Sequence, residues 1–220
     1  MSESIIESLN KIKSSIPNTV ELVAVSKTKP ASDIEIAYGA GQRIFGENKA
    51  QELANKYELL PKDIEWHMIG HLQRNKVKYI APFVSLIHGV ESERLLKEIN
   101  KNGAKFERKI PVLLQIHIAQ ESNKFGLTAE ELVAILENAV SYKNIEFKGL
   151  MGMATFTDDQ DQIALEFEFL NDLFQAQKKA FPELTDFNQL SMGMSGDFEL
   201  AIEKGSTMIR VGSSIFGSRN

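Results

Sequence analysis

Short runs of apolar residues alternate along this chain with stretches in which apolar residues recur at helical spacing. Most of the runs begin roughly 20 to 40 residues after the previous one, which is about what a strand, two loops and a helix consume. The repeating unit is therefore predicted to be a strand followed by a helix. The predicted strands are Val20–Val25, Arg43–Phe45, Glu65–Ile69, Leu86–Val90, Ile110–Ala119, Ile145–Met153, Asn188–Met192 and Met208–Gly212.

The segments between these runs predict helices, and an additional amphipathic helix over Ile5–Ser14 precedes the first strand. Some of them have residues suited to cap a helix start, and glycines suited to end one, at their boundaries. The capping candidates are Ser92, Thr128 and Asp159, and the terminating glycines are Gly41, Gly103 and Gly205. The predicted helices are Asp33–Ala40, Lys49–Leu60, Asn75–Ile80, Ser92–Asn102, Ala129–Val140, Ile163–Ala180 and Asp197–Lys204.

Alternating strands and helices are compatible with a doubly wound open sheet or with a closed barrel, and a count of eight favours a (β/α)8 TIM-type barrel. No linker rich in glycine, proline or serine interrupts the alternation. We therefore expect residues 1–220 to form a single barrel domain with an extra N-terminal helix and no C-terminal β domain.

Composition narrows the function classes. The 220 residues include 25 basic and 30 acidic side chains, so the net charge of −5 gives no reason to expect a nucleic-acid partner. The absence of cysteine excludes a disulfide framework, a thiolate nucleophile and a Cys-ligated metal. The first residues lack the pattern of a signal peptide, and no apolar stretch approaches the length of a membrane span. A cytoplasmic location is expected.

Lys27 is the first candidate for chemistry, because active sites of such barrels lie at the carboxyl ends of the strands. Strand alternation places it on the same face as Val23 and Val25, which directs its amine along the barrel interior. A lysine among apolar groups can form a Schiff base with a carbonyl compound. The alternative is a solvated lysine at a strand end, like Lys29.

The segments after the last two predicted strands are candidates for a phosphate site, which commonly lies at this point of a TIM barrel. Residues 191–197 and 212–217 contain the glycines and hydroxyl groups that such a site uses. Met194, Ser195, Gly212 and Ser213 are the candidate binding residues. The alternative is a pair of capped loops, with Ser195 or Asp197 as an ordinary N-cap.

Arg210 lies within the last predicted strand, where a buried guanidinium needs a partner. That partner is either an interior acid such as Glu47 or Glu21, or an anionic group or ring nitrogen of a ligand. Closure of a barrel makes the last strand a neighbour of the first, which brings Arg210 and Gly212 next to Lys27. A lysine, an arginine and a phosphate cup together are what a pyridoxal phosphate site requires.

Metal binding is not expected. The four histidines, His67, His71, His88 and His117, show no metal-binding spacing. Asp158, Asp159 and Asp161 lack the glycine and terminal glutamate of a calcium loop, so they indicate a helix start.

Several motifs in a fixed order resemble one family. They are residues 25–28 (VSKT), 45–48 (FGEN), 66–70 (WHMIG), 149–153 (GLMGM), 191–195 (SMGMS), 209–212 (IRVG) and 216–217 (FG). On these residues the chain is identified as a member of the YggS/PROSC-type pyridoxal phosphate homeostasis proteins, which are similar to the barrel half of alanine racemase. One departure is His71, where relatives often have proline.

The resemblance implies roles for individual residues. Lys27 matches the lysine that holds pyridoxal phosphate as an aldimine, and Arg210 matches the arginine that faces the pyridine nitrogen. Ser195, Gly212 and Ser213 match the phosphate cup. Asn48 matches an asparagine near the ring, although it could equally be the N-cap of the following helix.

The resemblance also implies a protein that holds, buffers and delivers pyridoxal phosphate, with apo-enzymes as possible partners. The alternative is a weak amino-acid racemase, which would need a second acid–base group such as His67 or His117 opposite the lysine. The tyrosines Tyr38, Tyr57, Tyr79 and Tyr142 all fall in or beside predicted helices. A Schiff-base aldolase is more remote. Without the second domain of alanine racemase we expect a monomer.

Overall fold

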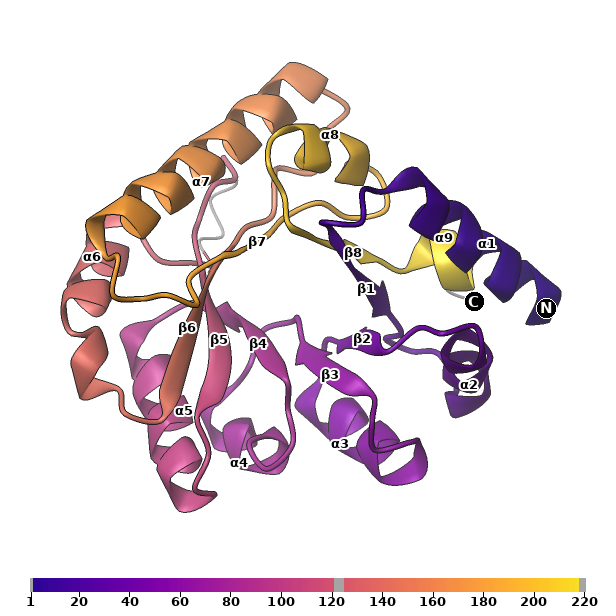
Figure 1. Cartoon of the computed structure of the whole chain (residues 1–220), viewed down its shortest axis with the longest axis horizontal. Helices are drawn as coiled ribbons and strands as arrows, with labels where there is room; N and C mark the ends of the chain where they lie inside the picture. The colour runs from indigo at the N-terminus through magenta and orange to yellow at the C-terminus, as the bar shows by residue number, and fades with distance from the viewer. Residues whose placement is uncertain (1, 121–124, 218–220) are drawn as a thin grey trace.

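A closed barrel of eight parallel strands, each hydrogen-bonded to its neighbours in chain order, forms the centre of the computed structural model (Figure 1). The structure describes residues 2–120 and 125–217. The predicted (β/α)8 barrel is confirmed. The strands are β1 (Glu21–Val25), β2 (Ile44–Glu47), β3 (Glu65–Met68), β4 (Leu86–Val90), β5 (Ile110–Gln115), β6 (Ile145–Met151), β7 (Gln189–Ser191) and β8 (Met208–Val211).

Pairing of β1 with β8 closes the barrel, and its register aligns Val23 with Arg210 and Ala24 with Val211. Because both strands run in the same direction, the residues that follow them emerge at the same end. The register therefore brings the segment after Val25 beside Gly212, where a Cβ atom would lie 3.0 Å from the Val25 carbonyl oxygen.

Helices surround the barrel (Figure 1). The expected N-terminal helix is present as α1. Thr128 forms a reciprocal capping box with Glu131, and Ser92 and Asp159 cap their helices through side-chain oxygens. The helical elements are α1 (Ser2–Ser15), α2 (Ala31–Gly39), α3 (Ala50–Leu59), η1 (Arg74–Lys76), α4 (Val77–Ile80), α5 (Glu93–Lys105), α6 (Ala129–Glu137), η2 (Ala139–Ser141), α7 (Gln160–Ala180), α8 (Phe198–Glu203) and α9 (Ser213–Phe216).

Two of the three glycines predicted to end helices do so. Gly41 and Gly205 have φ angles of +84° and +95° just past the helix ends, a conformation that glycine adopts without strain. Gly103 was wrongly assigned, because α5 continues to Lys105. A Cβ atom at Gly103 would lie 2.8 Å from the Asn144 backbone oxygen, so the glycine allows close packing of the helix against a neighbouring loop.

Strand ends differ more from the predictions than strand starts. The apolar run from Ile110 continues to Ala119, but β5 ends at Gln115 and Ile116 instead forms an isolated bridge with Leu127. The second strand extends two residues beyond its predicted end, to Glu47. The loop after β8 contains the unpredicted single-turn helix α9.

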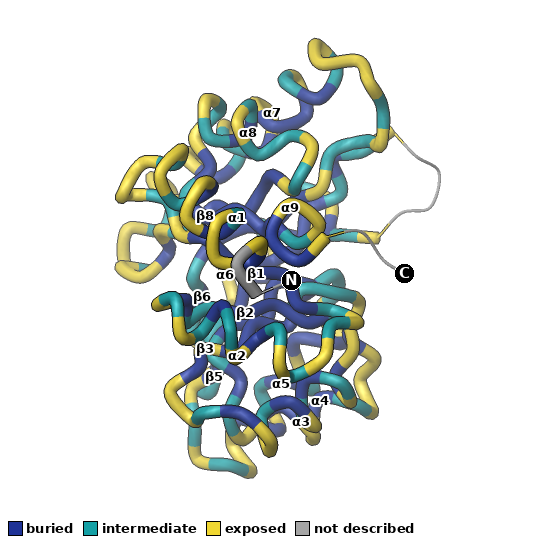
Figure 2. Tube along the Cα trace, turned by 90° about the vertical axis from the view of Figure 1, so that its right-hand side faces the viewer, coloured by how far each residue is buried: buried dark blue, intermediate teal, exposed yellow. Residues whose placement is uncertain are grey.

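Apolar side chains form two separate cores. The larger lies between the strands and the helices, and Figure 2 shows the buried segments of the trace mostly in the middle of the molecule and the exposed segments at its periphery. The smaller fills the barrel interior with Val23, Leu86, Leu113, Met151 and Met208, each no more than 3% exposed. The interior is therefore a packed plug below the carboxyl ends of the strands.

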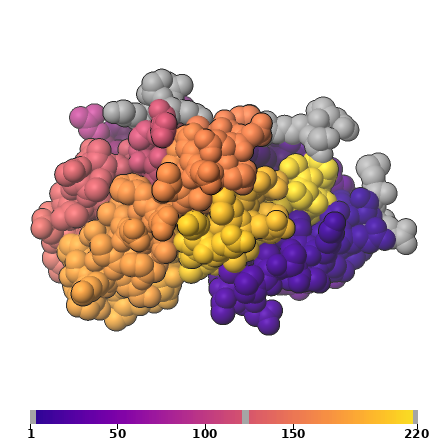
Figure 3. Space-filling view, turned by 90° about the horizontal axis from the view of Figure 1, so that it is seen from above, coloured from indigo at the N-terminus to yellow at the C-terminus, as the bar shows by residue number. Residues whose placement is uncertain are grey.

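The N-terminal helix α1 lies beside the C-terminal segment. The indigo and yellow surfaces adjoin in Figure 3, and α1 packs beside α2 and α9. Leu9, on the buried face of α1, is fully enclosed. This packing covers the outer side of the junction between β1 and β8.

Candidate functional site

A cavity of about 760 Å³ lies at the carboxyl ends of the strands. Its walls come from the ends of all eight strands or the segments that follow them. All seven residues that the sequence singled out for cofactor binding line it, although they come from four separate segments of the chain. They are Lys27, Asn48, Met194, Ser195, Arg210, Gly212 and Ser213.

Lys27 lies two residues beyond the end of β1, and strand alternation directs it inward. Val23 belongs to the interior plug, and Val25 and Lys27 line the cavity above it. The Lys29 N–H donates a hydrogen bond of 3.0 Å to the Ser26 carbonyl oxygen. Lys27 thus occupies a four-residue turn at the edge of the cavity.

Asn48 enters the same cavity after β2. Its position depends on Gly70, where a Cβ atom would lie 2.6 Å from the Asn48 backbone oxygen. The proposed capping role of Asn48 is wrong, because the N-cap of α3 is Lys49 and no side-chain hydrogen bond caps that helix. Its side chain is half-buried at the cavity wall.

The loops after β7 and β8 meet through one hydrogen bond. The Gly212 N–H donates to the Ser195 hydroxyl oxygen at 3.3 Å. The β7 loop is itself braced by Asp197, whose carboxylate accepts the Met194 N–H at 2.5 Å. Burial raises the pKa of Asp197, whereas this hydrogen bond and the nearby Arg210 lower it. The Asp197 side chain therefore stabilises the loop rather than capping α8 in the usual way.

Arg210 is 4% exposed and is held by two hydrogen bonds. Its guanidinium donates to the Ser191 hydroxyl at 2.6 Å and to the Gly152 carbonyl oxygen at 3.0 Å. Burial lowers the pKa of Arg210 to about 10, against the opposing effect of Asp197, so the group remains charged at neutral pH.

Of the two alternatives for the partner of Arg210, an ion pair with Glu47 or Glu21 is not formed. Glu47 pairs with Lys56 at 2.8 Å on the outer side of the barrel. Glu21 begins β1 and is therefore at the opposite end of the barrel from the cavity. Arg210 instead rests on neutral partners, which leaves its charge available to the cavity that it lines.

A buried hydrogen-bonded chain continues from Arg210 through the barrel. Ser191 contacts His88 Nδ1 at 3.1 Å, and His88 Nε2 contacts His67 Nδ1 at 3.0 Å. Since arginine only donates, Ser191 accepts from Arg210 and can give its own proton to His88. His88 Nε2–H then donates to His67, which fixes the tautomers of both rings.

Both imidazoles in this chain are neutral. Desolvation lowers the pKa of His67 to about 3 and lowers that of His88 well below its usual value. Neither His67 nor His117, the two candidates for a second base, is among the described residues that line the cavity. His71 does line it and pairs with Glu91 at 2.8 Å, with its ring 5.7 Å from that of Phe125.

The four tyrosines do not line the cavity, and Asp159 of the aspartate cluster caps a helix. None of Tyr38, Tyr57, Tyr79 and Tyr142 is among the described residues at the cavity. Asp159 accepts the N–H groups of Asp161 and Gln162 and so begins α7, as predicted. Within the described ranges, no three His, Asp or Glu side chains are grouped to hold a metal ion.

Other cavity residues had no signal in the sequence. The segment of residues 153–158 after β6 contributes much of the wall, including Phe156, which is 98% exposed. Such segments carry no recognisable motif, because they line the cavity only through their position at the carboxyl ends of the strands.

No helix of the described chain is long and apolar enough to cross a membrane.

The fold and the cavity define a barrel of the alanine racemase type. The family described as alanine racemase, N-terminal domain, matches residues 2–220. The alanine racemase of Bartonella henselae has the same fold, with a TM-score of 0.75 at 17% identity. The match covers 99% of this chain and 59% of that enzyme.

Closer similarity is found among smaller proteins. A pyridoxal phosphate homeostasis protein of Vibrio alginolyticus is 37% identical over 209 residues, covering 93% of this chain and 88% of the relative. The human protein of that name is 40% identical over 211 residues, covering 90% and 76%. This chain belongs to the pyridoxal phosphate homeostasis protein family.

A solved structure in this group is that of PipY from Synechococcus elongatus with pyridoxal phosphate bound. It has a TM-score of 0.89 and 34% identity to this chain. The alignment covers 97% of this chain and 100% of PipY. The resemblance inferred from the motifs is thereby confirmed.

Proposed function

We propose that this protein binds pyridoxal 5′-phosphate in the cavity at the carboxyl ends of the strands, covalently through Lys27. The observation that carries the proposal is that one cavity is lined by an amine, two serine hydroxyls with adjacent glycines, and a buried charged guanidinium. These are the groups that the aldehyde, the phosphate and the ring of this cofactor require. The bound cofactor of PipY supports the same assignment.

The residues that line the cavity fit pyridoxal phosphate. A Cβ atom at Gly212 would lie 3.0 Å from the Val25 carbonyl oxygen, so glycine leaves room at the point where the β1 and β8 ends meet. Ser195, Gly212 and Ser213 would hold the phosphate there, and Asn48 and Met194 would flank the ring. Arg210 would face the ring nitrogen, and a permanent positive charge at that point disfavours protonation of the nitrogen.

The covalent step is a condensation. The neutral Lys27 amine adds to the aldehyde carbon, and loss of one water molecule leaves a carbon–nitrogen double bond. The cofactor would supply an electrophilic aldehyde and a conjugated ring. The step is reversible, so another amine or water can release the cofactor.

We propose that this reversible attachment serves cofactor homeostasis, with the protein holding pyridoxal phosphate and delivering it to apo-enzymes. Support comes from the names of the relatives and from the absence of tyrosine among the described cavity residues, since racemases need a second acid–base group. The expected monomeric state stays a prediction that sedimentation equilibrium can test.

Borohydride reduction tests the attachment. Reduction of the loaded protein followed by peptide mapping should place the cofactor on Lys27, and Lys27→Ala should lose the visible absorption band and remain folded. Lys29→Ala is the matched control, because the Lys29 amine donates to the Phe216 carbonyl oxygen at 2.8 Å. Labelling of Lys29 or another lysine would contradict the proposal.

A further inference from the structure

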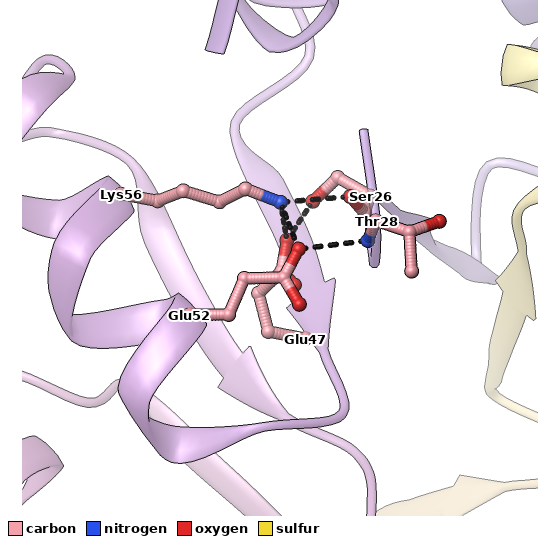
Figure 4. Close-up of polar contacts among 5 residues, drawn as sticks. All are labelled: Ser26, Thr28, Glu47, Glu52 and Lys56. Carbon is pink, nitrogen blue, oxygen red and sulfur yellow. Dashed lines mark hydrogen bonds and ion pairs between the residues drawn. The ribbon is translucent and has the colours of Figure 1, made fainter. Parts of the chain in front are cut away.

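The two residues that flank Lys27 are both fixed by side chains of the β2–α3 unit (Figure 4). The Ser26 hydroxyl donates to Glu47 Oε1 at 2.6 Å. The Thr28 N–H donates to Glu52 Oε1 at 2.7 Å. Lys27 therefore lies between two residues that hydrogen bonds hold in place.

Lys56, on α3, joins these anchors. Its ammonium group donates to Glu47 Oε1 at 2.8 Å, to Glu52 Oε1 at 2.8 Å and to the Ser26 carbonyl oxygen at 2.9 Å. An ammonium group has three N–H donors, so these three contacts saturate it. One side chain therefore links both carboxylates to the backbone that precedes Lys27.

The anchored segment is strained. Thr28 has a φ angle of +66°, which is unfavourable for a β-branched residue and costs free energy that the surroundings must offset. It occupies the third position of the turn from Ser26 to Lys29, where a positive φ ordinarily selects glycine or asparagine. The charge-assisted bond from the Thr28 N–H to Glu52 opposes relaxation of this strain.

Stability alone does not explain the buried cluster of Lys56, Glu47 and Glu52. Lys56 and Glu47 are 8% and 0% exposed, and the second oxygen of Glu47 has no hydrogen-bond partner among the described residues. Desolvating both charges offsets much of their attraction, so well-packed apolar residues would often be at least as stable. Buried ion pairs of this kind are better suited to fixing one geometry than to adding stability.

We propose that Lys56, together with Glu47 and Glu52, is a positioning group that holds the Ser26–Lys29 turn so that the Lys27 amine points into the cavity. The cluster lies on the outer side of the strand, since Ser26 and Lys27 alternate, and Lys56 is not among the residues lining the cavity. Its effect on the amine is transmitted through the backbone. The inference rests on the proposed attachment at Lys27.

The test measures the attachment directly. Pyridoxal phosphate is added to the apo-protein, and the rate constant for appearance of the borohydride-reducible Lys27 adduct is recorded with the pH midpoint of its visible band. Lys56→Met should slow adduct formation by about tenfold or more, which corresponds to losing one charge-assisted interaction, and should shift the midpoint. Lys56→Arg should restore part of the rate.

Two variants separate positioning from general damage. Lys97→Met is the matched control, since Lys97 also pairs with a glutamate four residues earlier, Glu93 at 2.8 Å, on an exposed face of α5. It should leave the rate and the midpoint unchanged. Thr28→Asn placed in Lys56→Met should recover part of the rate, because asparagine tolerates a positive φ better than threonine.

Glu52→Gln tests the positioning role if Lys56→Met does not fold. The Glu52 side chain is 24% exposed, so the variant is tolerated more easily, and it should slow adduct formation by about threefold through the weakened bond to Thr28. Folded variants with wild-type rates and midpoints overturn the positioning role while the attachment stands. Failure of the wild-type protein to form an adduct at Lys27 overturns both.

Discussion

The hydroxyl oxygen of Ser195 accepts the backbone N–H of Gly212, which joins the loop after β7 to the loop after β8 at 3.3 Å. These loops come from segments 17 residues apart and form one wall of the cavity. The contact links the two loops of the wall. Because it is long for an N–H···O bond, it is weak enough to leave the Ser195 hydroxyl able to turn toward an anion.

Replacement of Ser195 and Ser213 by alanine should weaken retention of pyridoxal phosphate at least tenfold. The reason is the loss of two charge-assisted hydrogen bonds, each worth about 1.5 to 3 kcal/mol. The dissociation constant is measured by absorbance titration, and the adduct should still form at high cofactor concentration. Ser214→Ala is the matched control, because Ser214 is not among the described cavity residues. Equal affinities for all three proteins would place the phosphate elsewhere.

Ser191→Ala should destabilise the fold. Ser191 links Arg210 to His88, and its removal leaves both buried groups short of a partner, at a cost of about 1 to 3 kcal/mol each. Denaturant unfolding of the cofactor-free protein measures the change in unfolding free energy. Ser214→Ala, at an exposed site, is the comparison variant. A loss no greater than that of Ser214→Ala would mean that the chain from Arg210 to His67 contributes nothing to stability.

Glu47 should make stability fall as the pH rises. Burial raises the pKa of Glu47 to about 7 despite the hydrogen bonds from Lys56 and Ser26. Between pH 4.5 and 7 the folded state therefore keeps a proton on Glu47 that the unfolded state has lost. The contribution is complete below pH 4.5 and is lost as the pH rises through 7. The loss is about 3 kcal/mol at most.

Unfolding free energies of the wild-type protein and Glu47→Gln, measured across this range, isolate the contribution. Their difference should change with pH between the two pKa values and become constant above and below them. A difference that is the same at every pH would show that folding leaves the pKa of Glu47 unchanged, which contradicts the prediction.

The buried histidines act in the opposite direction. Desolvation lowers the pKa of His67 from 6.5 to about 3. Below pH 6.5 the unfolded state therefore binds a proton at His67 that the folded state does not bind. Stability from this source should therefore decrease as the pH falls from 6.5 toward 3. His67→Gln should flatten this part of the pH profile relative to wild type. A parallel profile for His67→Gln would contradict the assignment.

The loaded protein should exchange no Cα proton of common amino acids at a useful rate. Lys27 can act as one base, but a positioned partner on the opposite face is worth about 10² to 10⁴ in rate, and no tyrosine is among the described cavity residues to supply it. Deuterium incorporation into L-alanine and L-serine in heavy water, followed by chiral analysis, gives the answer. Exchange with inversion would identify a racemase, with His71 the cavity histidine to replace first.

The barrel was predictable because its information is local. Eight apolar runs with helical segments between them fix the number and order of strands, and alternation within β1 indicates that Lys27 lies on the inner face. Strand closure then places Arg210 and Gly212 beside the first strand. Each step needs only residues that are close in sequence and the rule that strands of a barrel pair in order.

The side-chain networks were not predictable, because their partners are distant in sequence. Ser191 and His88 are 103 residues apart, and Lys56 reaches a carbonyl oxygen 30 residues before it. Periodicity reports which face a residue occupies but not which residue meets it across the barrel. For this reason the sequence did not indicate Ser191 and Gly152 as partners of Arg210, and the role of Lys56 had only the weak signal of a glutamate four residues earlier.

The packed barrel interior determines how molecules reach the cavity. Val23, Leu86, Leu113, Met151 and Met208 close the lower end, so there is no through-passage along the barrel axis. Any molecule bound above them therefore enters and departs at the carboxyl ends of the strands, where the side chains of Met194 and Phe156 are exposed. Under the proposed function, an incoming amine and an outgoing cofactor would pass through this same face, and a protein that receives the cofactor would approach it there.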